Sequence, residues 1–187
     1  MYINRLFVAC IVSLVATSFG FIVRAILLNE WGVLFNLTET QKGAIQGAGL
    51  FPFALSIILF SLIIDKVGYG RIMVVAWSLH VVSAVITMSA TSFTYLYIGT
   101  FLFALANGAV EAVVNPATTT MFPKNKTHYL NILHAGWPGG LVLGGILAIS
   151  MSGLEGGNIW RYKIGLFLIP TLIYGLMLLG QKWPVQE

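Results

Sequence analysis

Two ionisable side chains, Arg24 and Glu111, lie inside long apolar stretches of the sequence. An ionisable group in the hydrocarbon of a membrane is unfavourable by about 2.5–3.5 kcal/mol on insertion scales, so each one needs a structural or functional reason. A buried carboxyl can bind and release a proton, because burial disfavours its charged form. A buried guanidinium offers paired hydrogen bonds to an anion. Proton transfer and anion binding are therefore the chemistries to consider.

Asn107 and Asn115 flank Glu111 at the spacing of one helical turn on each side. Positions i, i+4 and i+8 lie along one side of a helix, so we expect a single polar stripe. The alternative is that Glu111 is a neutral acid that only bonds a neighbouring helix. The flanking amides favour a role in proton coupling, with both asparagines as candidate solute ligands.

Asn131 and His134 are further candidate solute ligands, near the start of another apolar stretch. A single histidine near a helix start is more often structural, so that alternative stays open for His134. Arg24 also has an alternative, in which its side chain snorkels toward the membrane surface near Glu30. His80 has few polar neighbours at helical spacing, and we expect it to be structural.

The rest of the chain is apolar enough to fold in a lipid bilayer. Of its 187 residues, 58% are hydrophobic and 9% are charged, whereas soluble domains carry about 25% charged residues. The net charge of +4 comes from basic residues scattered at the ends of segments, which argues against nucleic acid as a partner. Cys10 is the only cysteine, so no disulfide forms within the chain.

Six apolar blocks are long enough to cross a bilayer as helices, which takes about 20 residues each. Barrel strands are shorter and alternate in polarity. We therefore predict an all-α integral membrane protein, with residues 1–187 forming one bundle of six transmembrane helices. Thr38 and Gln41 have the spacing of a capping box, which predicts the start of the second helix. Gly136, Gly140 and Gly144 predict a close helix contact. The blocks are residues 6–31, 43–64, 72–90, 95–121, 130–151 and 164–180.

The basic residues predict the orientation, because cytoplasmic loops are enriched in lysine and arginine. With both termini in the cytoplasm, that side carries six basic residues and the other side three. We therefore expect a multi-pass protein of the plasma (inner) membrane with cytoplasmic termini. The six are Arg5, Lys66, Arg71, Lys124, Lys126 and Lys182, and the three are Lys42, Arg161 and Lys163.

The connection between the second and third blocks resembles the signature loop of the major facilitator superfamily. The family pattern is G-x-L-A-D-R-x-G-R-R, and Asp65, Lys66, Gly68 and Arg71 lie in or next to matching places. The resemblance implies a gating loop on the cytoplasmic side. It also implies a fold of two six-helix halves, each built from inverted three-helix repeats, of which this chain resembles the first. The family's first glycine and its fourth-helix arginine have no counterpart here.

A narrower resemblance is to the fucose-permease group of proton-coupled sugar transporters. It rests on E-x-x-x-N-P from Glu111 and N-x-x-H-A-G from Asn131. This likeness implies that Glu111 carries the proton and that Asn107, Asn115 and Asn131 bind sugar hydroxyls. The group's acid in the first helix is replaced by Arg24, which suits an anionic solute at least as well as a neutral sugar.

The favoured function is secondary active transport of a small polar solute, a sugar or an organic acid, coupled to protons. The expected partners are the solute, protons, the bilayer and a second six-helix half from the same or another chain. We expect no metal or other cofactor, and no enzyme activity, because no pair of catalytic groups is present. The alternative is a non-transporting or truncated six-helix module that needs a partner half.

Overall fold

The computed structural model describes residues 4–154 and 156–184, and these residues form helices and turns without strands. Six helical spans are long and apolar enough to cross a membrane. The sixth is divided at Phe167 into two shorter helices. The prediction of an all-α, multi-pass membrane protein is confirmed. The helices are α1 Arg5–Leu34, α2 Glu39–Val67, α3 Tyr69–Met88, α4 Phe93–Met121, α5 Lys126–Ser150, α6 Ile159–Leu166 and α7 Leu168–Leu178.

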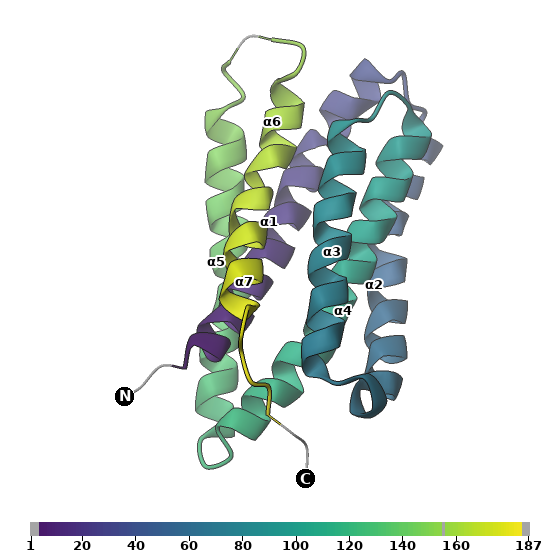
Figure 1. Cartoon of the computed structure of the whole chain (residues 1–187). Coiled ribbons are helices and arrows are strands. Elements are labelled where there is room, and N and C mark those ends of the chain that lie inside the picture. The colour runs from purple at the N-terminus through teal and green to yellow at the C-terminus, as the bar shows by residue number, and fades with distance from the viewer. Residues whose placement is uncertain (1–3, 155, 185–187) are drawn as a thin grey trace.

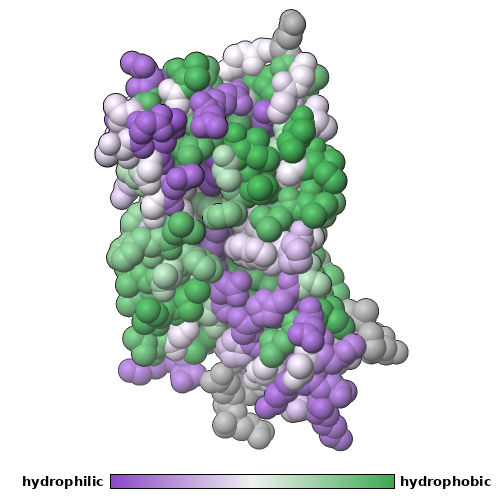
Figure 2. All heavy atoms as spheres, turned by 180° about the vertical axis from the view of Figure 1, so that it is seen from behind, coloured by the Kyte–Doolittle hydropathy of each residue, from purple (hydrophilic) through white to green (hydrophobic). Residues whose placement is uncertain are grey.

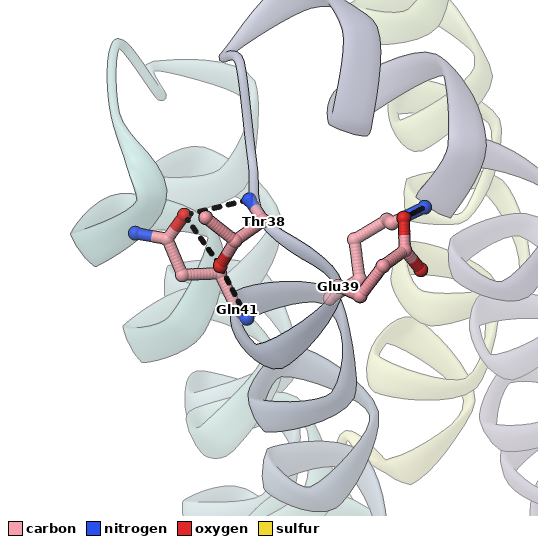
Figure 3. Close-up of polar contacts among 4 residues, drawn as sticks. Thr38, Glu39 and Gln41 are labelled. Carbon is pink, nitrogen blue, oxygen red and sulfur yellow. Dashed lines mark hydrogen bonds and ion pairs between the residues drawn. The ribbon is translucent and has the colours of Figure 1, made fainter.

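The start of α2 is the capping box that the sequence predicts (Figure 3). The backbone N–H of Gln41 donates to Thr38 Oγ1 at 3.2 Å, and Gln41 Oε1 accepts from the Thr38 N–H at 2.9 Å. Glu39 and Lys42 form an ion pair of 2.6 Å beside the cap. Because these contacts satisfy the first backbone donors, α2 begins before the apolar block at residue 43.

Helices α1 and α4 form the centre of the bundle (Figure 1). Helix α1 packs mainly on α5 and α7, and α4 packs mainly on α2 and α3. The first helix of each three-helix set therefore packs against the second and third helices of the other set. Because the first set crosses the membrane three times, an odd number, the second set starts from the opposite side and runs in the opposite direction. This exchange is the pattern of an inverted three-helix repeat.

The two ends of the bundle differ in which turns they carry (Figure 1). The start of α1 and the end of α7 lie at one end, where the Arg5 guanidinium donates to the Leu176 carbonyl at 2.9 Å. We call this the terminal end; it also carries Gly68 and the turn at 122–125. The opposite end, which we call the far end, carries the turns at 35–38 and 89–92 and the described parts of the connection after α5, residues 151–154 and 156–158.

The outward faces of α2, α3, α5 and α7 carry large exposed apolar side chains. In Figure 2, hydrophobic residues cover both flanks of the middle of the molecule, while hydrophilic residues gather at both ends and along a hollowed strip between the flanks. Contiguous apolar surface of this kind is unfavourable in water and suits contact with lipid or with another membrane segment. Examples are Leu62, Val82, Ile149 and Leu176.

The close contact that the glycine spacing predicts lies between α5 and α1. Gly136, Gly140 and Gly144 are buried against α1. A Cβ atom on Gly140 would lie 3.0 Å from the Cα atom of Val15. The two backbones therefore approach more closely than any side chain at this position would allow.

Candidate functional site

A cavity of about 440 Å³ lies between α2 and α4 in the half of the bundle nearer the terminal end. Its polar lining comes from Glu111 and Asn115 on α4 and from Ser61 and Asp65 on α2. Glu111 is half-buried, and its carboxylate accepts a hydrogen bond from Asn115 Nδ2 at 3.1 Å. Within the described chain no basic side chain forms an ion pair with Glu111. This carboxyl can therefore exchange a proton through the cavity without first breaking a salt bridge.

A second, smaller cavity of about 130 Å³ lies between α1, α2 and α4, nearer the far end. Arg24, Gln46 and Thr100 provide its polar lining, and Phe21 and Phe103 are among its apolar walls. The two cavities therefore lie in opposite halves of the bundle, and both use residues of α2 and α4.

The Arg24 side chain turns into the bundle and is only 6% exposed. Its Nη1 donates to Thr87 Oγ1 at 2.9 Å, and its Nη2 donates to Ser83 Oγ at 3.5 Å. The guanidinium carbon lies 4.7 Å from the centre of the Phe103 ring. Glu30, the expected neighbour of a snorkelling arginine, instead pairs with Lys163 at 3.5 Å. The structure thus has the buried arrangement of Arg24 and not the snorkelling one.

Asn107 does not extend the polar stripe of Glu111 and Asn115, which corrects the expectation of a single stripe. It is 2% exposed and lines neither cavity. Its Oδ1 lies 2.8 Å from His80 Nε2, and His80 Nδ1 lies 2.8 Å from the Tyr174 hydroxyl. A buried network therefore joins α3, α4 and α7 through His80. Local spacing gave little signal for His80, because its partners lie on other helices.

Asn131 and His134 are exposed on α5 and line neither cavity. The Asn131 side chain forms no hydrogen bond with the part of the chain that the structure describes. Of the predicted solute ligands, the structure thus places Asn115 beside Glu111 and leaves Arg24 in its own cavity.

The signature-like residues lie at the terminal end, on both sides of one glycine. Asp65 and Lys66 occupy the last turn of α2, and Arg71 lies in the first turn of α3. Gly68 alone connects the two helices, with φ at +88°. A residue with a Cβ atom rarely adopts this φ, so the one-residue turn depends on glycine. Asp65 also reaches the cavity of Glu111, which brings the loop and the buried acid together.

Comparison with known sequences decides the family. A sequence model described as the Major Facilitator Superfamily matches residues 5–185. This chain belongs to the major facilitator superfamily. The family that the residues around Asp65 resemble is therefore confirmed, and it is a family of membrane transporters.

Two proteins of known name are similar to this major facilitator chain. It is 27% identical to the L-fucose-proton symporter of Escherichia coli (strain K12) over 107 residues, which are 56% of this chain and 24% of that protein. Its fold matches the crystal structure of a D-xylose-proton symporter with a TM-score of 0.82 at 14% identity. That match covers 98% of this chain and 49% of the other, so the chain spans about half the length of the solved relative. The predicted likeness to the fucose-permease group is confirmed.

Proposed function

We propose that this major facilitator chain is one half of a secondary active transporter that moves a small polar solute, a sugar or an organic acid, together with protons. The observation that carries the proposal is the Glu111 carboxyl, which is half-buried beside a 440 Å³ cavity and has no cationic partner in the described chain. Both similar proteins are named as proton symporters of sugars, which supports the same class of function.

Asn115 suits both protonation states of Glu111. Its Nδ2 donates to the carboxylate at 3.1 Å, while its Oδ1 is buried and has no hydrogen-bond partner. A protonated carboxyl needs an acceptor for its O–H, and an amide oxygen provides one. Water in the cavity stabilises the charged form, and loss of that water favours the neutral form. Glu111 would therefore release its proton when the cavity is open and retain it when the cavity closes.

The remaining residues receive roles around this acid. Asn115, Asn131 and His134 would contact the solute where α4 and α5 face the cavity that a second six-helix half completes. Asn107 would act indirectly, because its amide is held by His80. The signature-like residues would gate the terminal end. These are Asp65, Lys66, Gly68 and Arg71.

A second candidate function is a six-helix membrane subunit that does not transport alone. It is favoured by the chain spanning 49% of the solved relative's length. Reconstitution tests both. The purified chain is placed in proteoliposomes with an imposed proton gradient and offered a panel of labelled sugars and organic acids. We expect accumulation that a protonophore abolishes. Uptake that is the same with and without the gradient would contradict coupling, and no uptake would favour the subunit.

We further propose that the terminal end faces the cytoplasm in the plasma (inner) membrane, because it carries the larger share of basic residues. Single cysteines test this orientation. Asn36→Cys should react with a membrane-impermeant maleimide on intact cells, whereas Lys66→Cys should react only after permeabilisation. The unmodified chain is the control, because Cys10 is fully buried. Labelling of both variants from the same side would show that the proposed topology is wrong.

A further inference from the structure

The positive charge of Arg24 is not balanced by an acid among the residues that the structure describes. Arg24 and Lys163 are the buried arginine and lysine side chains of the described residues, and only Lys163 has a carboxylate partner. The Ser83 and Thr87 hydroxyls and the Phe103 ring contact the guanidinium, but none of them carries a net negative charge. A buried charge without a counter-charge is strongly unfavourable. The cavity beside Arg24 is therefore suited to an anion.

The guanidinium also has unused hydrogen-bonding capacity. An arginine side chain has five N–H donors. Two of them are used, toward Thr87 and Ser83 on α3. The other donors have no partner in the described chain, and Arg24 is among the residues that line the 130 Å³ cavity. A carboxylate accepts two parallel hydrogen bonds from a guanidinium, which is the strongest pairing available to that group.

Thr100 adds an independent observation in the same cavity. It is 4% exposed, and its hydroxyl has no hydrogen-bond partner within the described chain. In contrast, the Thr87 and Thr171 hydroxyls donate to the carbonyl one turn earlier, at 2.8 and 2.9 Å. A buried hydroxyl without a partner destabilises the protein, so a ligand that accepts from it is favoured. Gln46 adds an amide group from α2.

We infer that this cavity binds the carboxylate of a short-chain monocarboxylic acid. Among the described residues Arg24 is the one cation in its lining, which matches a single negative charge. A volume of about 130 Å³ is well above the roughly 10–15 Å³ that one water molecule requires, and it leaves room for a carboxylate and a short substituent. Phe21, Leu28 and Phe103 form apolar walls, which disfavour a polyhydroxylated sugar. The inference names the solute of the proposed transporter, and in that respect it rests on the proposed function.

Equilibrium binding tests the site without a proton gradient. Isothermal titration calorimetry on the purified chain compares L-lactate, its neutral amide lactamide and the dianion malonate. We expect L-lactate to bind about 10- to 100-fold more tightly than lactamide, the range for a charged hydrogen bond. Malonate should also bind more weakly than L-lactate. Arg24→Lys should weaken L-lactate binding about tenfold, because lysine lacks the paired donors.

Thr100→Val is the decisive variant, since it keeps the side-chain shape and removes the unpartnered hydroxyl. We expect it to raise the melting temperature of the ligand-free protein and to weaken L-lactate binding about tenfold. A purely structural threonine would not change these two readouts in opposite directions. Lys42→Gln is the matched control, because it removes a positive charge near the far end and Lys42 does not line the cavity. Its affinity for L-lactate should equal that of the unmodified chain.

Equal binding of L-lactate and lactamide, or unchanged affinity in Thr100→Val, would overturn the site. This failure is distinguishable from a failure of proton coupling. If L-lactate binds as expected but Glu111→Gln still accumulates solute with protons, the site stands and the proposed coupling falls. If a neutral sugar is accumulated with protons while L-lactate does not bind, coupling stands and the monocarboxylate site falls.

Discussion

Glu111→Gln is expected to abolish proton-driven accumulation while leaving the fold and the downhill exchange of solute intact. Glutamine has nearly the shape of the protonated acid and can still bond Asn115, but it releases no proton. With one proton per solute, a gradient of about one pH unit supports roughly tenfold accumulation. The variant should therefore fall from about tenfold to no accumulation. Proteoliposome uptake under an imposed gradient measures this loss, and counterflow without a gradient measures the retained exchange.

Glu39→Gln is the matched control for this experiment. Glu39 is an exposed glutamate at the start of α2, where it pairs with Lys42 away from the cavity. It undergoes the same chemical change, and accumulation should be unchanged. If transport requires a second six-helix half, both variants are compared in the assembled pair. Full pH-dependent accumulation by Glu111→Gln would show that Glu111 only packs against its neighbours.

The second large effect is expected at the contact between α1 and α5. A Cβ atom on Gly140 would meet the backbone of Val15, with the Cα atom at 3.0 Å. Backbone atoms do not rotate away as a side chain can, so the two helices must separate. Overpacking of this kind destabilises a protein by about 1–3 kcal/mol. Gly140→Ala should lower the free energy of unfolding by that amount, measured by denaturant titration in mixed micelles.

Gly139→Ala is the neighbouring control, because a Cβ atom there meets nothing within 4 Å. Alanine favours helix over glycine by up to about 1 kcal/mol, so this variant should be neutral or slightly stabilising. Gly140→Ala should therefore lower the free energy of unfolding, whereas the adjacent Gly139→Ala should not. Equal effects from both would contradict the close approach of α1 and α5.

The helices could be predicted from the sequence because apolar length sets what spans a bilayer, but their ends depend on polar contacts. The start of α2 was predictable, since both capping partners are local. Helix α6 begins at Ile159, before the predicted block at 164. Its first turns contain Arg161, whose Nε donates to the Met88 carbonyl at 2.8 Å, and Lys163, which pairs with Glu30. A helix predicted from an apolar stretch leaves out such charged residues, although partners distant in the sequence pair with their charges and hydrogen-bonding groups.

The site was predictable only in part, for a geometric reason. A helix turns 100° per residue, so positions four apart differ by about 40° and positions eight apart by about 80°. Helix α4 has neighbours on several sides, so the rotation of about 80° between Asn107 and Asn115 is enough to turn their side chains toward different helices. Glu111 and Asn115 face the cavity beside α2, while Asn107 faces His80 on α3. Such a division depends on which helices pack against α4, and spacing within α4 does not contain that information.

The single glycine between α2 and α3 has a mechanical consequence. Consecutive Cα atoms are about 3.8 Å apart, so the facing ends of the two helices stay within about 7.6 Å of each other in any conformation. Gly68 is therefore the point about which α2 can rotate relative to α3. Asp65 lies beside Gly68, whereas Gln46 lies about 33 Å from Gly68 along α2 at 1.5 Å per residue. A small rotation of α2 about Gly68 leaves Asp65 nearly stationary and moves Gln46, in the wall of the Arg24 cavity, through a much larger arc.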